Sequence, residues 1–435
     1  MSSAPVSAPQ PNLEVLGEAQ RNRAMWAVLL VVFIDILGFT VVLPLLPFYT
    51  EHFGGTPLVV GSVTAVYGLC QFIAGPILGS LSDRIGRKPV LLFSQLGTLI
   101  GFIVLATASS LPFVFLGRII DGLTAGNISV AQAFIADLAG PRNRTKAFGM
   151  FGAVFGLGFI AGPALSGLLA RYSLTAPLWA SAGLSVITLI ANIILLPKTV
   201  PGSANVSREG SSPLAPNTAA TETKRPRRSK WQMIVKLNLS LLPFFCFAMA
   251  FTSFTSGLAL YAERTLTWAG RPFGTTQVGW VMTIGGAMSF SVQAGLLGKV
   301  SKWVSERSMS LFGFASMTIG YAILAPGQSA YIFICLFLLG SIGQSFIRPS
   351  LTSLTSQVAD KAEQGLAMGS LQSIQSISQA TAPLLSGLMI EHAFLHQWTL
   401  MCATFAFVGC LLALRIPKGI QNRNSSQLES AKGNS

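Results

Sequence analysis

The chain has 435 residues, of which 51% are hydrophobic and only 10% are charged, and its net charge is +14. So much apolar surface cannot be buried inside one water-soluble core, which makes lipid part of the solvent. A positive charge of this size suits nucleic-acid binding only when it gathers on a basic folded domain, and the sequence contains none.

Residues 1-24 form a polar, proline-containing N-terminal tail. They contain no short apolar core followed by a small-residue cleavage site, so we expect no removable signal peptide. The first apolar stretch then serves as its own insertion signal.

Twelve apolar stretches of about 18 to 27 residues follow, each long enough at ~1.5 Å per residue to cross the ~30 Å hydrocarbon layer as a helix. We therefore expect an all-α integral membrane protein with twelve transmembrane helices. The predicted spans are 25-49, 58-82, 89-109, 112-138, 145-171, 176-196, 237-262, 276-298, 308-325, 330-357, 364-391 and 398-416.

The placement of Lys and Arg predicts the orientation of these spans. With both termini in the cytoplasm, 24 of the 29 basic residues lie on the cytoplasmic side, three lie outside (Arg171, Arg264, Arg271) and two lie within spans (Arg118, Arg348). This excess follows the positive-inside rule. We expect a multi-pass protein of the inner or plasma membrane with both termini in the cytoplasm.

A polar segment separates the spans into two sets of six. It is rich in Pro, Ser, Thr and Gly and carries a basic run from Lys224 to Lys230, so it buries too little apolar area to fold alone. We predict a six-helix bundle at 25-197, a flexible basic linker at 198-236, a second six-helix bundle at 237-417 and a cytoplasmic tail at 418-435.

The two halves resemble each other weakly in sequence. Tyr49-Thr50-Glu51 resembles Tyr261-Ala262-Glu263, and Pro163-Ala164-Leu165-Ser166-Gly167 recurs in the second half as Pro383-Leu384-Leu385-Ser386-Gly387. Several matches in register are typical of a transporter built by internal duplication around a central cavity.

Three charged side chains lie well inside predicted spans of the first half, away from the span ends: Asp35, Arg118 and Asp121. A charge in hydrocarbon is costly and must face a partner or a wet cavity. Asp121 follows Arg118 at i+3 and is its obvious local partner. Because burial and a nearby Arg act in opposite directions on a carboxyl group, such a residue can load and release a proton.

We predict that Asp35 carries the proton and that the Arg118–Asp121 pair tunes it. A static buried ion pair is the alternative. Counting along the helices places Arg118 nearer the outer face than Asp35 by roughly 10 Å, so a further group has to bridge them.

A tight, charged turn joins spans two and three: Gly79-Ser80-Leu81-Ser82-Asp83-Arg84-Ile85-Gly86-Arg87-Lys88. It resembles, nearly residue for residue, the signature loop of the major facilitator superfamily. The resemblance implies that Asp83 closes a cytoplasmic gate against span eleven and that Arg87 pairs with Asp137 at the end of span four. Arg84, Arg87 and Lys88 belong to this gate, or they only set the topology.

Span five is rich in small residues and contains Gly152, Gly156, Gly158, Gly162 and Pro163. The run from Gly156 to Pro163 resembles the antiporter motif of the superfamily, which favours export over import. Small residues at these spacings also let helices approach closely, and proline bends a helix, so tight packing is an alternative explanation.

Polar side chains at helical spacing are expected to line a central substrate cavity. Arg348 in span ten either meets an anionic part of the substrate or closes the inner gate. The glutamines of span eleven lie on one face, where hydrogen bonding between helices explains them equally well. The candidates besides Arg348 are Asn127, Gln132, Gln293, Gln344, Gln372, Gln375 and Gln379.

Across the whole chain, the sequence resembles most closely the drug:proton antiporters, and among them the tetracycline efflux group. Asp35 with Pro44 and Pro47, the loop around Asp83 and the start of span five carry this resemblance. It implies a secondary transporter, expected to be a monomer, that exports a small organic molecule in exchange for protons by alternating access.

Two positions depart from the pattern of that group. The group usually carries an acidic residue in span nine and a His near the end of span seven, where this chain has Met317 and Thr267. The resemblance therefore does not extend to tetracycline recognition as a metal chelate.

Other classes of function stay open at this point. A proton-coupled importer or a non-transporting receptor would use the same fold. An intramembrane enzyme would need a metal set or a catalytic dyad, and the best candidate, His392 with His396 beside Glu391, lacks a third ligand. We predict no catalysis, metal or cofactor; the expected partners are protons, a small molecule and the lipid bilayer.

Overall fold

The computed structural model describes residues 18–125, 127–196, 230–301, 303–358 and 364–416. Within them the chain forms thirteen α-helices, one π-helical turn (η3) and one two-stranded antiparallel ribbon. The elements are α1 (Glu18–His52), α2 (Pro57–Ile85), α3 (Arg87–Ala106), α4 (Leu111–Thr124), α5 (Asn127–Leu169), α6 (Ala176–Leu195), α7 (Lys230–Thr265), β1 (Thr267–Trp268), β2 (Arg271–Pro272), α8 (Thr275–Ser291), η3 (Val292–Leu296), α9 (Leu297–Val300), α10 (Glu306–Ala322), α11 (Ala330–Val358), α12 (Gln364–Glu391) and α13 (Leu395–Ala413).

Helical backbone is what an apolar environment requires, because hydrocarbon offers no partner to a free N–H or C=O group. Local signals fix where individual helices begin. Thr56 caps α2, its hydroxyl accepting from the amide of Val59, and Pro57 follows at the first helical position, where a missing N–H costs nothing. Ser305 caps α10 in the same way through the amide of Ser308.

The described helices account for the expected membrane-crossing architecture. Nine described stretches are long and apolar enough on their own to cross a membrane. The predicted spans without such a stretch are the fourth, ninth and eleventh. They correspond to α4 with 14 residues, α10 with 17 residues and the glutamine- and serine-rich α12, which are too short or too polar to be recognised as membrane-crossing helices by length and hydropathy alone.

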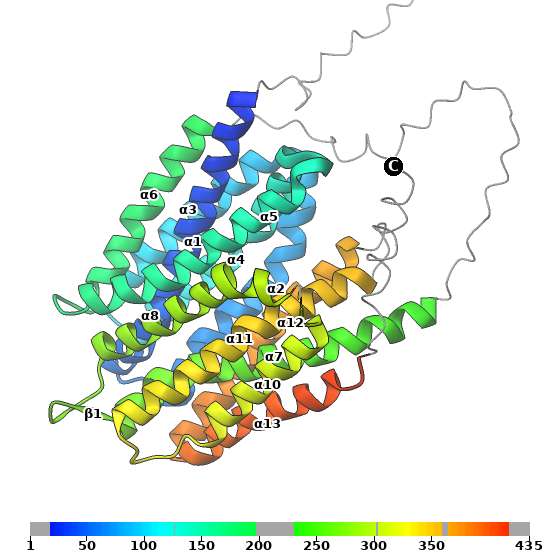
Figure 1. Cartoon of the computed structure of the whole chain (residues 1–435). Helices are drawn as coiled ribbons and strands as arrows, with labels where there is room; N and C mark the ends of the chain where they lie inside the picture. Colours follow the sequence, from blue (N-terminus) through cyan, green and yellow to red (C-terminus); the bar gives the residue numbers. More distant parts are fainter. Residues whose placement is uncertain (1–17, 126, 197–229, 302, 359–363, 417–435) are drawn as a thin grey trace, which may run out of the picture.

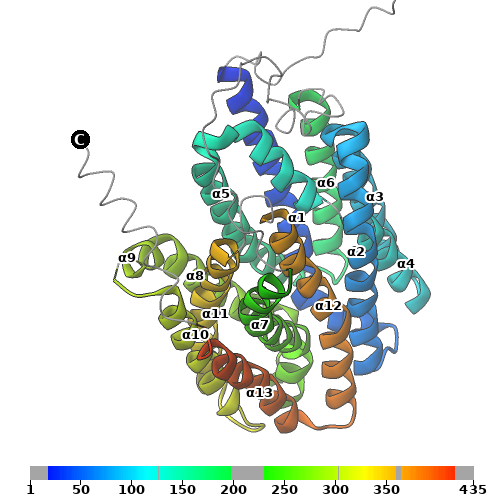
Figure 2. The ribbon, with the colours of Figure 1, turned by 90° about the vertical axis from the view of Figure 1, so that its right-hand side faces the viewer.

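The break expected between spans four and five lies elsewhere in the structure. Helix α4 ends at Thr124, and α5 then continues for 43 residues without interruption. At ~1.5 Å per residue this is about 65 Å, twice the hydrocarbon thickness. Figure 2 shows α5 bending at one end of the molecule, so one continuous helix supplies the rest of span four and all of span five.

Two further boundaries differ from the expected ones. Helix α1 begins at Glu18 and α7 at Lys230, several residues before the predicted spans, because polar residues extend both helices beyond the apolar stretch. Most of the predicted linker 198-236, most of the tail 1-24 and all of the tail 418-435 lie outside the described residues.

The helices form two groups, whose most extensive contacts with each other involve α2, α5, α8 and α12. In the first group α1 packs on α5 and α6, and α3 packs on α4 and α6. In the second, α10 packs on α11 and α13, and α7 packs on α12 and α13. Helix α2 meets α12 and α5 meets α8 across the boundary between the groups (Figures 1 and 2).

The groups converge at one end of the molecule. Figure 1 shows them meeting near β1 and diverging toward the starts of α1 and α7. We call these the joined end and the diverging end. A core around Trp398 and Phe254 in the second group also takes in Val60 of α2, together with Leu43 and Phe48 of α1. The core at the diverging end of the first group contains first-group residues alone.

Close backbone approach marks the joined end. A Cβ on Gly61 of α2 would collide with the carbonyl oxygen of Pro383 of α12. A Cβ on Gly68 would lie 2.6 Å from the carbonyl carbon of Gln379. Farther along α2, a Cβ on Gly75 or Gly79 would meet nothing within 4 Å. The two groups therefore pack tightly over the first part of α2 and separate beyond it.

Gly61→Ala should lower the free energy of unfolding of the purified protein by about 1–3 kcal/mol, because its methyl group would overpack the α2–α12 contact. Gly79→Ala on the same helix is the matched control and should be neutral or slightly stabilising. Thermal unfolding in detergent measures both. Equal melting temperatures for the two variants would contradict the close approach.

Candidate functional site

An ion pair lies buried among α2, α3 and α4. Arg118 Nη1 is 2.9 Å from Asp121 Oδ2, with the two side chains only 3% and 10% exposed. Both residues are on α4, one turn apart, so the helix itself places them together. The hydroxyl of Thr98 on α3 also donates to the Asp121 carboxylate. The pair is therefore held from two helices.

Tyr67 of α2 connects this pair to α1. The guanidinium carbon of Arg118 lies 4.4 Å from the centroid of the Tyr67 ring, within the range of a cation–π contact. On α1, Phe39 stacks on the same ring with a centroid distance of 5.8 Å. Asp35 lies one turn before Phe39 and, like Arg118 and Asp121, is close enough to act electrostatically on Tyr67.

The ring of Tyr67 thus contacts both Arg118 and, through Phe39, the helix that carries Asp35. Sequence reasoning missed this residue. The available signal was that Tyr67 is the single tyrosine of the second predicted span and carries a hydroxyl at a depth where polar groups are costly.

Amide side chains extend the polar cluster toward the second group of helices. Gln71, one turn after Tyr67, directs its Nε2 toward the Tyr67 hydroxyl at 3.5 Å. The Oε1 atoms of Gln71 and of Gln379 on α12 are buried and have no hydrogen-bond partner among the described residues. A buried acceptor without a partner costs about 1–3 kcal/mol, so these oxygens favour a site that takes up water or a ligand.

The charged turn between α2 and α3 binds back onto the first group. Arg87 pairs with Asp83 at 2.6 Å and donates to the hydroxyl of Ser82 at 2.5 Å. Lys88 Nζ donates to the last carbonyl groups of α6, Ile193 and Leu196, at 2.9 and 2.5 Å. Lys88 therefore caps a helix end.

The gate expected between the loop around Asp83 and span eleven stays a prediction, because residues 359–363, the first side chains of α12 and the Asp137 side chain lie outside the described set. Asp83 is 56% exposed and pairs with Arg87 of its own turn, while Arg84 is exposed.

Polar contacts do cross between the groups at the joined end. Glu391 Oε2, at the end of α12, accepts from the Thr56 hydroxyl and from the Leu58 amide, both at 2.9 Å. Arg264 of α7 pairs with Glu51 of α1 at 2.6 Å. We call these five residues the latch. A carboxylate at the N-terminus of α2 also interacts favourably with the helix dipole.

Sequence reasoning did not assign the latch. Glu51 and Glu391 were noted only as part of a repeat and as a neighbour of two histidines. Acidic residues at the ends of predicted spans were the available signal, but nothing in the sequence pairs residues that lie hundreds of positions apart.

The small residues of α5 form its contacts with two helices. A Cβ on Gly158 or Gly162 would press against α1, and Gly156 and Pro163 lie against α8. A Cβ on Gly152 would meet nothing within 4 Å. Four of the five motif residues therefore serve close packing, two toward α1 and two across the boundary between the groups.

The predicted cavity residues are distributed over four elements. Arg348 is exposed, and its guanidinium carbon lies 4.9 Å from the ring centroid of Phe155 on α5. Gln344 donates to the hydroxyl of Ser289 on α8 at 3.2 Å. Exposed side chains are Gln293 and Gln372, half-buried ones are Gln132, Gln375 and Gln379, and the Asn127 side chain lies outside the described set.

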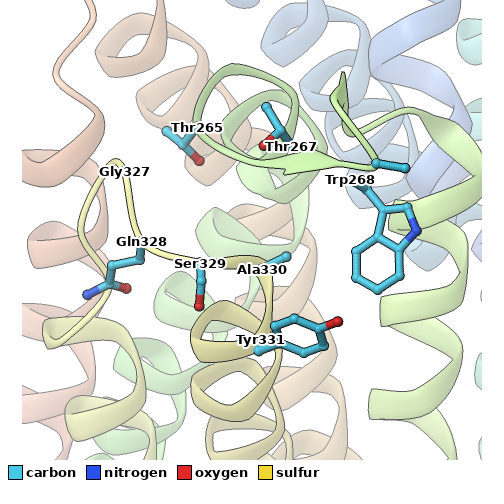
Figure 3. A pocket seen from close by; sticks show the side chains of 9 residues that line it. Thr265, Thr267, Trp268, Gly327, Gln328, Ser329, Ala330 and Tyr331 are labelled. Carbon is cyan, nitrogen blue, oxygen red and sulfur yellow. The ribbon is translucent and has the colours of Figure 1, made fainter.

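A hollow of about 800 Å³ lies apart from all of these residues. Figure 3 shows it between the end of α7 with β1 and the turn before α11, with Trp268 and Tyr331 on one side. The predicted proton-coupling, gating and cavity residues do not line it.

Comparison with known proteins gives a family and several relatives. A family model described as Major Facilitator Superfamily matches residues 28–383 and 276–432. The chain is 31% identical over 414 residues to the tetracycline resistance protein, class C, of Escherichia coli, covering 93% of this chain and 99% of that protein. It is 23% identical to the quinolone resistance protein NorA of Staphylococcus aureus (strain MRSA252), covering 85% and 90%.

Solved structures share the fold at lower identity. The crystal structure of the human organic anion transporter MFSD10 (TETRAN) superposes with a TM-score of 0.66 at 21% identity, covering 90% of this chain and 99% of that one. The peptide transporter POT in complex with sulfate gives a TM-score of 0.71 at 14% identity, covering 91% and 95%.

Arg118→Gln should lower the free energy of unfolding by about 3–5 kcal/mol, because it leaves the Asp121 carboxylate buried without a counter-charge. Adding Asp121→Asn should recover most of this loss, since both charges are then removed. Thermal unfolding of the two single variants and the double variant measures the coupling. Additive single effects would show that the two side chains do not act as a pair.

Glu391→Ala should increase opening of the joined end about tenfold, because it removes two hydrogen bonds to a charged acceptor. Val60→Cys, buried between the groups, reports this opening through its rate of labelling by a membrane-impermeant maleimide, read at peptide level by mass spectrometry. His392→Ala, at the adjacent exposed residue, is the matched control. If Val60→Cys is labelled at the same rate with and without Glu391→Ala, the latch does not hold the joined end closed.

Proposed function

Because the chain belongs to the major facilitator superfamily of membrane transporters, which are not enzymes, we propose that it exports a small organic molecule in exchange for protons. The observation that carries this proposal is the buried cluster of Asp35, Tyr67, Arg118 and Asp121. Ionisable groups at this depth are expensive and serve proton or ion pathways in membrane proteins.

Asp35 is the group that we propose to carry the proton. It is half-buried on α1, whereas Asp121 is almost fully buried and engaged by Arg118 and Thr98. Asp121 is already paired with Arg118 in the closed surroundings of α4, so we assign the moving proton to Asp35. The pair and Tyr67 then set the electrostatic surroundings in which Asp35 gains and loses its proton.

The unequal ends of the boundary support transport by alternating access. We assign the diverging end, with both termini, to the cytoplasm on the basis of the positive-inside rule. In that orientation the structure is an inward-facing conformation, in which the latch holds the outer side together. Export would require the latch to break and the loop around Asp83 to meet the second group at the cytoplasmic side.

Two observations support export and a drug-like substrate. The small residues of α5 resemble the antiporter motif of the superfamily, and two of them, Gly156 and Pro163, lie on the boundary with α8. The relatives named above are resistance proteins for tetracycline and quinolones, which are organic molecules of small size.

Asp35→Asn should abolish uptake driven by a pH gradient while leaving exchange at equal pH intact, because the substrate path remains and the proton carrier is lost. Proteoliposomes with an acidic lumen, assayed with tetracycline and with a fluoroquinolone, measure the first process, and counterflow of the same compounds measures the second. Glu306→Gln neutralises a carboxylate at the start of α10, away from the cluster, and is the control.

Three outcomes would contradict this function. If pH-driven flux is undiminished in Asp35→Asn, Asp35 does not carry the proton. Flux down the proton gradient in the same direction as protons would identify an importer, and the absence of flux with retained ligand binding would identify a receptor.

A further inference from the structure

Arg348 is a charged side chain that the proton cluster does not use. It lies within the 29-residue helix α11, beside Pro349, and its side chain is exposed. A guanidinium at membrane depth is tolerated where it faces water or a counter-charge. The side chain reaches across the boundary between the groups, because its guanidinium lies over Phe155 of α5.

The described side chains offer Arg348 no carboxylate. Their ion pairs join Arg87 to Asp83, Arg118 to Asp121, and Arg264 to Glu51 and Glu263. A cation–π contact to a phenylalanine compensates a charge far less than an ion pair does. Arg348 therefore presents a positive charge at the boundary between the groups, available to an anion from solution.

The surface opposite Arg348 is aromatic. Phe155 stacks on Phe159 with ring centroids 5.2 Å apart and an interplanar angle of 23°, and Phe151 follows at 6.2 Å. Phe155 and Phe159 are half-buried, so part of each ring is open to contact. These residues are one turn apart on α5 and form a continuous apolar strip.

This strip begins where the groups separate. Gly156, next to Phe155, still packs against Phe290 of α8, whose ring would lie 2.8 Å from an added Cβ. One turn toward the diverging end, an added Cβ on Gly152 would meet nothing within 4 Å. The guanidinium and the rings thus lie at the inner limit of the contact between the groups, where a molecule entering from the diverging end would stop.

We propose that the transported molecule is an amphipathic aromatic anion, whose small anionic group binds Arg348 and whose ring packs on Phe155 and Phe159. The two N–H groups of a guanidinium edge match the two oxygens of a carboxylate or two of the three oxygens of a sulfonate, and an offset aromatic stack suits a planar ring. The same charge disfavours a cationic substrate. This inference rests on the proposed export function and extends it by selecting the charge of the substrate.

A series of three naphthalene probes isolates charge from shape. These are 2-naphthalenesulfonate, the quaternary (2-naphthylmethyl)trimethylammonium ion and neutral 2-naphthylmethanol, whose ring systems are the same. The charges of the two ions do not change with pH, so a pH gradient cannot distribute them without the protein. Binding to the full purified chain is measured by titration calorimetry.

The sulfonate should bind more tightly than the other two probes. Arg348→Gln should weaken sulfonate binding roughly tenfold to hundredfold, the range for hydrogen bonds to a charged group, while leaving the neutral probe nearly unchanged. Arg348→Lys should retain part of the affinity, because it keeps the charge and loses the fork. Phe155→Leu should weaken all three probes alike, since each presents the same ring.

The results separate this proposal from that of export. Tighter binding of the quaternary ammonium ion than of the sulfonate in the unmodified protein, which needs no variant to fold, would overturn the anion assignment. So would sulfonate binding that does not change in Arg348→Gln. A third outcome is proton-driven transport of tetracycline or the ammonium ion, while the sulfonate is neither transported nor able to compete. This outcome would support export and overturn the anion assignment. Sulfonate binding that depends on Arg348, without pH-driven flux of any probe, would support the anion site and overturn export.

Discussion

Charge inside a membrane has to be compensated, and the first group of helices is organised around one such compensation. Arg118 and Asp121 lie 2.9 Å apart with almost no exposure, and the guanidinium also rests on Tyr67. Because removal of one charge would leave the other stranded, the surrounding helices must keep both in place. Thr98 from α3 and Tyr67 from α2 do so, which ties three helices to one ion pair.

The boundary between the two groups differs from this uniformly enclosed ion pair, because the helices on its two sides pack closely at one end and less closely at the other. At the joined end, backbones approach so closely that a single methyl group on Gly61 would not fit, and a shared apolar core encloses Val60. At the diverging end, the contacts of the charged turn that the described residues show, Asp83 with Arg87 and Lys88 with α6, lie within its own group. A boundary that is tight at one end and open at the other is what a rocking motion of two bundles around a central site requires.

Each of the two groups contains charged side chains at membrane depth, and in each group the neighbouring side chains indicate what those charges bind. The first group holds an ion pair and an additional carboxyl group at Asp35, and the second holds Arg348 facing an aromatic strip. The first arrangement suits a proton and the second an anion, and they belong to different helices on opposite sides of the boundary. Coupling between them would then pass through movement of the groups relative to each other.

Much of the fold could be predicted from composition because the bilayer limits the choices. Stretches of apolar residues must be helical, so most spans and the division into two sets follow from the sequence. The Arg118–Asp121 pair could also be predicted, since a separation of three residues on a helix fixes the contact whatever surrounds it. The fourth and fifth spans were placed less well, because a polar connecting segment can remain helical and only the packing of α5 decides where the chain bends.

The contacts between residues far apart in the chain were decided by the tertiary structure alone. Tyr67 contacts Phe39 and Arg118 because α2 packs on both α1 and α4, and Glu391 meets Leu58 because α12 crosses the start of α2. Arg348 could be recognised in the sequence as a charge in a span, but its position over Phe155 depends on how α11 and α5 face each other. Hydropathy and helical periodicity report the environment of a residue and not the identity of its neighbours, so these contacts follow only from the packed helices.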